Sequence, residues 1–189
     1  MLYLASQSPR RRALLEQLGL APGLLDVDVP EVRRPGEPAL DYVDRVAREK
    51  ADAGLRAVGA VPGARVLAAD TEVILDDEVF GKPADAADAA RMLRRLSGRT
   101  HGVATIVWLV GADAKASVRS LSEVSLAPLS DAVIEAYLGS GEWRGKAGAY
   151  AIQGRAAAFI SHLSGSYSGV MGLPLFETAG LLRAQGVPV

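Results

Sequence analysis

The chain contains 189 residues, of which 49% are hydrophobic and 23% are charged, and its formal net charge is -1. These values are typical of a globular protein that buries a sizeable core, and the length fits a single domain over residues 1–189. The near-neutral charge lacks the basic footprint of nucleic-acid binding, so we expect no nucleic-acid partner.

The residue types that the chain lacks narrow its chemistry. Cysteine is absent, which excludes disulfides, thiolate catalysis and zinc–thiolate sites. His101 and His162 are the only histidines, so a histidine-ligated metal or a serine–histidine triad is not expected. The sequence shows neither an apolar run of membrane-spanning length nor a signal-peptide pattern, and we therefore expect a cytoplasmic protein with no membrane partner.

The N-terminal segment predicts a strand followed by a helix. Leu2 to Ala5 is a short apolar run, Ser8 is suited to the N-cap position, and Pro9 is suited to the first helical position. The apolar spacing that follows continues this helix to Gly19, a plausible stop.

Arg10, Arg11 and Arg12 occupy the first turn of this predicted helix, at the positive end of its macrodipole. Each exposed cation there is unfavourable by about 0.3–1 kcal/mol. A strand, a tight turn, free backbone N–H groups and three guanidiniums together favour a receptor for a polyanion, most naturally phosphate. The alternative is a solvated basic patch that happens to follow a helix cap.

The remainder of the chain alternates between helical and strand patterns, which predicts an α/β protein with a mixed sheet. The stretch from Gly139 to Gly172 is rich in glycine and is predicted to consist mainly of loops. The other predicted elements are, in order, a short apolar segment at 24–29, a proline-rich loop at 30–38, a helix over 39–57, a strand over 65–69 ending at Asp70, a helix over 85–96 capped by Asp85, paired strands at 102–110 and 117–127, a helix from Ser130 to Leu138, and a last helix over 175–185.

Asp70 is the first candidate catalytic residue, because ligands of open α/β sheets gather at the carboxyl ends of strands. The Asp76-Asp77 pair can form a two-residue hairpin turn, which would set Thr71 opposite Lys82. Directly opposed side chains have Cβ atoms about 4.5–5.5 Å apart. This register predicts a carboxylate, a hydroxyl and an ammonium group at one end of the sheet; the alternative is a surface ion pair on a hairpin.

Other polar residues and glycine-rich loops are less specific signals. Glu31 lies in the proline-flanked loop and Lys50 lies in a charge run on a helix, so both could simply be solvated. The loops at 145–154 and 165–174 are rich in glycine, but neither has the Walker spacing of a P-loop.

Seven short motifs follow one another along almost the whole chain, from about Leu2 to the final helix. They are Leu4-Ala-Ser-Gln-Ser-Pro-Arg-Arg11, Ala68-Ala-Asp-Thr71, Gly81-Lys-Pro83, Leu93-Arg-Arg-Leu-Ser-Gly98, Lys146-Ala-Gly-Ala-Tyr150, Ile152-Gln-Gly154 and Gly172-Leu-Pro174. Together they resemble the motifs of the Maf family. Lys146-Ala-Gly-Ala-Tyr150 with Gln153 resembles the branch of that family that acts on dTTP and UTP, and the branch that acts on 7-methyl-GTP differs here.

The resemblance implies a fold, an activity and a set of roles. It implies an elongated mixed α/β sheet with flanking helices and two lobes around a cleft, similar to the inosine triphosphatases and commonly a homodimer. It implies a nucleoside triphosphate pyrophosphatase that leaves a nucleoside monophosphate. The implied roles are Asp70 as the catalytic proton acceptor, Arg10, Thr71 and Gln153 in substrate specificity, and Ser6, Arg11, Glu31, Lys50 and Lys82 as other polar positions of the pocket.

The sequence departs from the family pattern at three positions. Ala151 stands where glycine is usual, which removes the freedom to adopt a positive φ angle at that position. Asp77 replaces a glycine that is common in the hairpin, and Gly169 stands where a larger residue is frequent.

The expected reaction is an in-line attack of water on the α-phosphorus with pyrophosphate leaving. Mg²⁺ or Mn²⁺ would bridge Asp70, Glu31 and phosphate oxygens, and the division of Asp70 between proton acceptor and metal ligand stays open. The Gln153 amide offers a donor and an acceptor that match the N3–H and a carbonyl of uracil or thymine; the alternative is a glutamine that only ties its loop together.

Two other function classes are compatible with parts of this pattern. A non-catalytic nucleotide-binding regulator of cell division would need the basic pocket but not Asp70. A sugar nucleotidyltransferase would show a longer N-terminal glycine-rich loop, which this sequence lacks.

Overall fold

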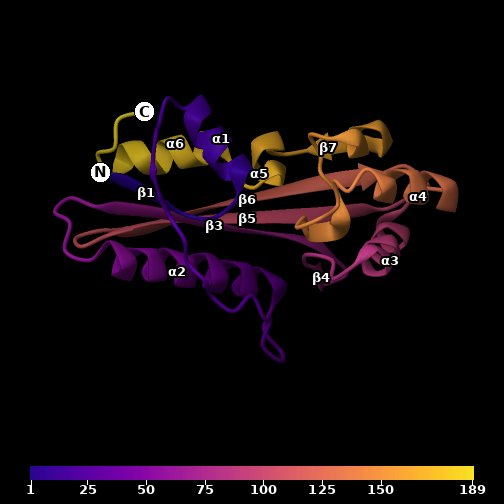
Figure 1. Ribbon diagram of the computed structural model, residues 1–189, viewed down its shortest axis with the longest axis horizontal. Helices are drawn as coiled ribbons and strands as arrows, with labels where there is room; N and C mark the ends of the chain where they lie inside the picture. The colour runs from indigo at the N-terminus through magenta and orange to yellow at the C-terminus, as the bar shows by residue number, and fades with distance from the viewer.

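A mixed sheet of seven strands runs along the length of the computed structural model, which describes residues 1–189 (Figure 1). The strand order is β2-β1-β3-β5-β6-β7, with β4 paired to β3. The β2–β1–β3 pairs are parallel and all the others are antiparallel, as a mixed α/β fold predicts. The strands are β1 (Leu2–Ala5), β2 (Gly23–Leu25), β3 (Arg65–Leu75), β4 (Glu78–Phe80), β5 (Thr100–Gly111), β6 (Lys115–Leu126) and β7 (Ile160–Ser164).

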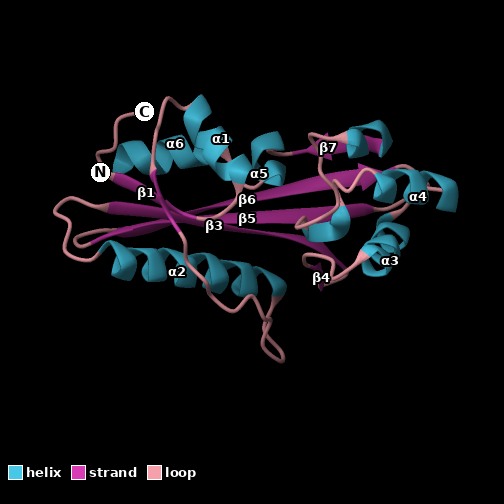
Figure 2. Ribbon diagram, viewed as in Figure 1, coloured by secondary structure: helices cyan, strands magenta, loops and turns pink.

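Helices cover both faces of this sheet (Figure 2). The long helix α2 lies along one face, α1 and α6 lie on the opposite face, and α3 and α4 gather at the far end of the long strands. None of the helices combines the length and the apolarity that crossing a bilayer requires. The helices are α1 (Pro9–Gln17), α2 (Ala39–Val58), α3 (Ala86–Leu96), α4 (Asp131–Gly139), α5 (Tyr167–Met171) and α6 (Leu175–Ala184), with 3₁₀ turns at Ala147–Ala149 and Arg155–Phe159.

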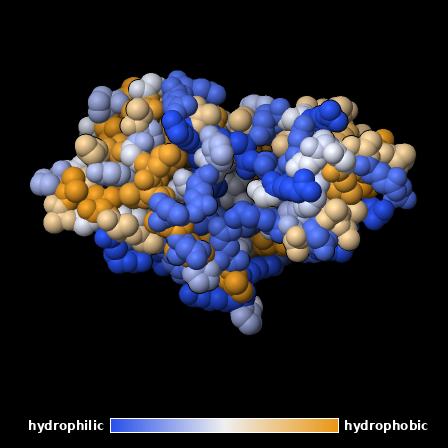
Figure 3. All heavy atoms as spheres, viewed as in Figure 1, coloured by the Kyte–Doolittle hydropathy of each residue, from blue (hydrophilic) through white to orange (hydrophobic).

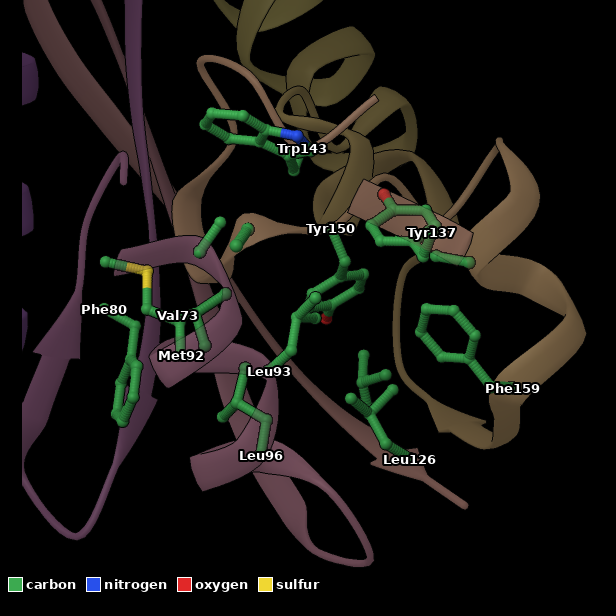
Figure 4. Close-up of a cluster of buried hydrophobic side chains, with 14 of the residues drawn as sticks. Val73, Phe80, Met92, Leu93, Leu96, Leu126, Tyr137, Trp143, Tyr150 and Phe159 are labelled. Atoms are coloured by element: carbon green, nitrogen blue, oxygen red, sulfur yellow. The ribbon is translucent and has the colours of Figure 1, made fainter. Parts of the chain in front are cut away.

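Separate apolar cores at the two ends of the sheet give the molecule two lobes. At one end, leucines of β1, α1, β3 and α6 pack together, among them Leu4, Leu14, Leu67 and Leu182. At the other end, aromatic and aliphatic side chains of β3, α3, α4 and the glycine-rich region form a second core (Figure 4). The labelled members of that core are Val73, Phe80, Met92, Leu93, Leu96, Leu126, Tyr137, Trp143, Tyr150 and Phe159.

The helix boundaries agree with the caps predicted from the sequence. Ser8 accepts a hydrogen bond from the backbone N of Arg11 at 3.4 Å, and Pro9 is the first residue of α1. The side chains of Asp85 and Ser130 cap α3 and α4 in the same way. Each cap satisfies a backbone N–H that has no partner within its own helix.

Strand β3 is longer than predicted, and Asp70 lies in its middle and not at its end. The ladder between β3 and β5 continues through Asp70 and Thr71, which are opposite Ile106 and Thr105. The long antiparallel partner therefore keeps the chain extended beyond the apolar run.

The predicted hairpin after β3 is confirmed at its turn but ends earlier than expected. Asp76 and Asp77 have φ angles of 54° and 61°, as a two-residue type I′ turn requires. Asp77 can occupy the position usual for glycine because aspartate is among the residues that tolerate a positive φ angle, and its carboxylate pairs with Arg33 at 2.8 Å. Leu75 is opposite Glu78 as predicted, but the ladder stops at Val73–Phe80, so Lys82 does not face Thr71.

The glycine-rich region contains a strand that the sequence pattern did not predict. β7 pairs with the end of β6, with a register shift between Ser125 and Leu126. The shift breaks the alternation of apolar and polar residues that identifies a strand. The predicted apolar segment at 24–29 is also shorter than expected, since β2 contains only Gly23–Leu25.

Candidate active site

A polar cleft of about 550 Å³ lies between the two lobes, and Figure 3 shows hydrophilic side chains around a hollow in the middle of the molecule. Its walls come from the β1–α1 turn, the middle of β3, the inner side of α2, and the two glycine-rich loops. Because β1 and β3 are parallel neighbours, the turn that follows Ala5 lies beside the middle of β3. The fold thereby places the first motif of the chain next to Asp70.

Arg11 is fixed on one wall of this cleft. Its Nε atom donates to the carbonyl of Gly172 at 2.8 Å, and its terminal nitrogens donate to Ser6 Oγ at 3.3 Å and Thr71 Oγ1 at 3.1 Å. Burial lowers the pKa of Arg11, and no carboxylate is hydrogen bonded to it. An arginine that is held by neutral groups and aimed into a cleft is suited to bind an anion.

Arg10 and Arg12 differ, although both belong to the same helical turn. Arg10 lines the cleft and its Nε atom donates to the carbonyl of Met171 at 3.3 Å. Arg12 is exposed and forms an ion pair with Glu16 at 2.8 Å, one turn along α1. The predicted polyanion receptor therefore uses two guanidiniums and not three, because the helical period turns the third one to solvent.

The Thr71 hydroxyl is held in one orientation by a short hydrogen-bonded chain. Thr71 Oγ1 lies 2.9 Å from Thr105 Oγ1, and Thr105 donates its hydrogen to the carbonyl of Gly169 at 2.8 Å. Thr71 must then donate to Thr105 while it accepts from Arg11. A Cβ atom at Gly169 would lie 2.8 Å from Ser120 Oγ, so the close approach explains why the larger residue frequent in the family is absent.

On the opposite wall, two lysines and two carboxylates form a continuous chain of ion pairs. Lys82 Nζ lies 2.6 Å from Glu31 Oε2, Glu31 Oε1 lies 2.6 Å from Lys50 Nζ, and Lys50 Nζ lies 2.7 Å from Asp70 Oδ1. Burial raises the pKa of Glu31, but the hydrogen bonds from Lys50 and Lys82 outweigh it and lower this pKa to about 2. Glu31 is thus a stable anion that connects both lysines.

Asp70 and Glu72 each present a buried oxygen without a hydrogen-bond partner. Asp70 is 4% exposed and Glu72 is 5% exposed, and both line the cleft. Asp70 Oδ2 and Glu72 Oε2 have no partner. Burial, together with the charges of Asp70 and Glu31, raises the pKa of Glu72 to about 8.

The second lobe contributes a mixed apolar and polar wall. Tyr150 lines the cleft, and its hydroxyl lies 2.8 Å from Nε2 of the buried His101. Gln153 is exposed at the rim. The other side chains on this side of the cleft include Val103, Arg144, Lys146, Ile152, Val170 and Met171. Apolar surface beside a basic rim suits a ligand with a flat ring and a charged tail.

Every site residue predicted from the sequence lines this one cleft: Ser6, Arg10, Arg11, Glu31, Lys50, Asp70, Thr71, Lys82 and Gln153. Lys82 joins the other site residues by its ion pair with Glu31, whereas the sequence predicted that it would face Thr71. Sequence reasoning gave no role to Glu72, Arg144 or Lys146. The signal for Glu72 was available, since an acidic residue two positions after Asp70 interrupts an apolar strand.

The alanine that replaces the usual glycine at position 151 does not disturb the backbone of its loop. Ala151 is not among the residues with a positive φ angle; in this loop that conformation falls on Gly145, Gly148 and Ala149, with φ angles of 65°, 68° and 60°. The replacement of glycine at position 151 therefore causes no backbone strain.

The donor set of the cleft fits a hard divalent cation that also binds the ligand. Carboxylate oxygens are the protein ligands that Mg²⁺ and Mn²⁺ prefer, and Asp70 Oδ2 is buried without a partner. No three acidic or histidine side chains converge closely enough to hold a metal by themselves. Such a cation would therefore need further oxygen ligands from a bound phosphate or from water.

Comparison with known proteins identifies relatives of the same length. The profile of a family described as Maf-like protein matches residues 1–185. A protein of Xanthomonas euvesicatoria pv. vesicatoria named dTTP/UTP pyrophosphatase is 59% identical over 188 residues, which cover 98% of this chain and 99% of that protein. A Xylella fastidiosa protein named nucleoside triphosphate pyrophosphatase is 58% identical over 183 residues, which cover 96% of this chain and 97% of its own length. The solved structure of the Staphylococcus aureus Ham1 protein has a TM-score of 0.45 and 14% identity, and the match covers 67% of this chain and 71% of that one.

Proposed function

This chain belongs to the Maf-like protein family, and from that premise we propose that it hydrolyses dTTP and UTP to the nucleoside monophosphate and pyrophosphate. Near full-length relatives at 58–59% identity with this activity in their names support the proposal. One observation in the structure carries it furthest. A buried carboxylate with a free oxygen lies in the same cleft as three arginines and three lysines.

The basic side chains are placed to bind the triphosphate. The four predicted from the sequence all line the cleft: Arg10 and Arg11 come from α1, Lys50 comes from α2, and Lys82 follows β4. A nucleoside triphosphate carries about four negative charges, and several cations around it neutralise the charge that repels an attacking nucleophile. Arg11 is the most firmly positioned of the four because three hydrogen bonds hold its guanidinium.

Asp70 is placed to accept a proton from the attacking water. Lys50 holds Oδ1 at 2.7 Å and leaves Oδ2 buried and free. The water oxygen forms a bond to the α-phosphorus while the bond from that phosphorus to the oxygen bridging to the β-phosphate breaks. Asp70 accepts the proton of the water, and pyrophosphate leaves with the bridging oxygen. The balance is one triphosphate and one water consumed for one monophosphate, one pyrophosphate and one proton.

We also propose Mg²⁺ or Mn²⁺ as the cofactor; Asp70 and Glu31 were the ligands predicted from the sequence. When bound, the cation would neutralise phosphate charge and lower the pKa of a nearby water. The contacts of Glu31 weigh against it as a ligand. Both of its oxygens accept from lysines, so a cation bound there would lie against two ammonium groups.

The base is expected to lie against the wall of the second lobe, where Tyr150 and Ile152 provide apolar surface and Gln153 provides a polar amide. Gln153 would select uracil and thymine through their N3–H and carbonyl groups. Thr71 and Arg10, the other predicted specificity residues, also line the cleft. Both predictions stay open to test.

The test of the function is pyrophosphate release from purified protein with Mg²⁺ and a panel of canonical triphosphates. We expect turnover of dTTP and UTP well above that of ATP and GTP. Tight nucleotide binding without pyrophosphate release would instead support the alternative of a non-catalytic regulator. A homodimer and a cytoplasmic location stay predictions; light scattering on the purified protein measures the first.

A further inference from the structure

The carboxylates of the cleft differ in how many of their oxygens are available to a cation. Both oxygens of Glu31 accept from ammonium groups, at 2.6 Å each. Oδ1 of Asp70 accepts a hydrogen bond from Lys50, so only Oδ2 is available. The proposed reaction needs that oxygen to accept a proton. The two roles predicted for Asp70 therefore compete for a single atom.

The carboxylate of Glu72 is not needed for a second role. Its Oε2 atom is buried and has no hydrogen-bond partner, and no ion pair involves its side chain. Asp70 and Glu72 are two positions apart on β3, so their side chains project from the same face of the sheet into the same cleft. When ionised, a buried carboxylate without a partner is costly, and a bound cation is one of the few partners that can compensate for it.

The Oε2 atom of Glu72 also lies close to the segment that precedes Lys82. It is 3.9 Å from the position that a Cβ atom would occupy on Gly81. Gly81 precedes Lys82, one of the cations expected to bind phosphate. A cation at Glu72 would thus have phosphate oxygens within reach to complete its coordination.

We propose that Glu72 is the carboxylate that binds the divalent cation, while Asp70 Oδ2 stays available as the proton acceptor and Glu31 positions Lys50 and Lys82. This inference rests on the proposed function for the identity of the other ligands, which are phosphate oxygens and water. Glu72 is thereby a metal ligand, and Glu31 is a positioning residue.

The test measures binding of Mn²⁺ alone to the full chain, by the paramagnetic resonance signal of the free ion. Glu72→Gln and Glu31→Gln are a matched pair, because each replaces one carboxyl group of the same cleft by an amide with little change in shape. We expect the Mn²⁺ dissociation constant of Glu72→Gln to exceed that of Glu31→Gln at least fivefold. A smaller ratio, or a wild-type protein that does not bind Mn²⁺, overturns the assignment.

A second pair of variants keeps the assignment testable if Glu72→Gln does not fold. The chain has no cysteine, so Glu72→Cys introduces a single thiol. A thiolate at a true ligand position should bind the soft cation Cd²⁺ and give the absorption band of a cadmium–thiolate bond. We expect this band in Glu72→Cys and not in Glu31→Cys. Its absence from Glu72→Cys overturns the proposal.

Pyrophosphate release by the wild-type protein is measured separately, which keeps the two proposals distinguishable. If the wild type turns over dTTP but Glu72→Gln binds Mn²⁺ like Glu31→Gln, the assignment fails and the function stands. If Mn²⁺ binding depends on Glu72 but no triphosphate is hydrolysed, the function fails and the metal site stands.

Discussion

The two oxygens of Asp70 have different surroundings, and the difference gives this residue its proposed role. Oδ1 accepts from Lys50 at 2.7 Å, whereas Oδ2 is buried without a partner. The ion pair with Lys50 fixes one oxygen, and the other oxygen is left to accept a proton. One oxygen of Asp70 thus holds the side chain in place, and the other has the proposed chemical role.

Asp70→Asn should lower kcat for dTTP by roughly 10²–10⁴-fold, because the amide cannot accept a proton in the transition state. Pyrophosphate release measures the loss, and circular dichroism checks the fold. Asp52→Asn is the control, since Asp52 is also a carboxylate paired with a lysine, Lys115, but lies on the surface. A loss of less than tenfold in Asp70→Asn would refute the assignment.

Gln153→Ala should lower kcat/KM for dTTP and UTP about tenfold more than for CTP. A site that hydrogen bonds one base pattern discriminates steeply, because the wrong base leaves buried polar groups without partners. Kinetics on the three triphosphates measure the selectivity, with the exposed Gln17→Ala as the control. An equal loss on all three would mean that Gln153 only supports its loop.

At the scale of elements, the first turn of α1 combines a helix cap with the proposed anion-binding arginines. Ser8 caps the helix, while Arg10 and Arg11 are directed into the cleft and Arg12 to solvent. The three adjacent arginines thereby form a natural series in which burial and contacts differ but residue type does not.

Alanine at each of the three positions should separate binding from stability. Arg11→Ala should raise KM for dTTP and also destabilise the fold by about 1–3 kcal/mol, because it removes three hydrogen bonds. Arg10→Ala should raise KM with a stability change within about 0.5 kcal/mol. Arg12→Ala should change neither quantity. Urea unfolding and steady-state kinetics provide both readouts, and an unchanged KM in Arg10→Ala and Arg11→Ala would remove both from the binding site.

The glycine-rich loop around Gly148 depends on close approach as well as on backbone conformation. Gly148 has a φ angle of 68°, and a Cβ atom there would lie 2.8 Å from a methyl group of Val73. Gly145 has a φ angle of 65° but open space around it. Substitutions at Gly145 and Gly148 therefore separate two free-energy costs of adding a side chain: the strained backbone conformation and the close contact with Val73.

Gly145→Ala should destabilise the protein by about 1–2 kcal/mol, the cost of a left-handed conformation. Gly148→Ala should lose about 1–3 kcal/mol more, because the added methyl overpacks the core beside Val73. Urea unfolding of both variants measures the difference. Equal losses would show that the loop moves freely away from β3.

At the scale of the whole molecule, the cleft exists because the two lobes are joined rigidly. The long strands β3, β5 and β6 pass from one apolar core to the other. His101 on β5 adds a buried polar link to the second lobe, since its Nε2 atom lies 2.8 Å from the hydroxyl of Tyr150 in the core shown in Figure 4.

This buried histidine should make stability depend on pH. Burial lowers the pKa of His101 from 6.5 to about 4, so between these values the unfolded chain binds more protons than the folded one. Its contribution is complete above pH 6.5 and is lost as the pH falls toward 4. At about 1.4 kcal/mol per pH unit, the contribution of His101 should fall by roughly 1–2 kcal/mol between pH 7 and pH 5, and other groups such as Glu72 add their own pH dependence.

His101→Gln should remove this part of the pH dependence, because glutamine does not titrate. Urea unfolding at pH 7, 6 and 5 on both proteins gives the comparison, and each protein is referred to its own value at pH 7. Parallel curves for the wild type and the variant would show that His101 titrates normally in the folded state.

Much of the fold and most of the candidate site could be predicted from the sequence, because the signals are local. Ser8, Asp85 and Ser130 mark helix starts through their own backbone contacts, and the Asp76-Asp77 turn follows from its flanking strands. The site residues were found by motif, and motifs retain the order of residues that the fold later brings together. All of the residues so predicted do line one cleft.

Tertiary structure alone decided what depends on distant partners. The pairing of β3 with β5 placed Asp70 inside a strand, and pairing with β6 produced β7 within a glycine-rich stretch. The occupied oxygens of Glu31 and the free oxygen of Glu72 also depend on neighbours far along the chain. Local propensity determines where elements begin and turn, whereas hydrogen-bond pairing and charge between remote residues determine which side chain is left free to act.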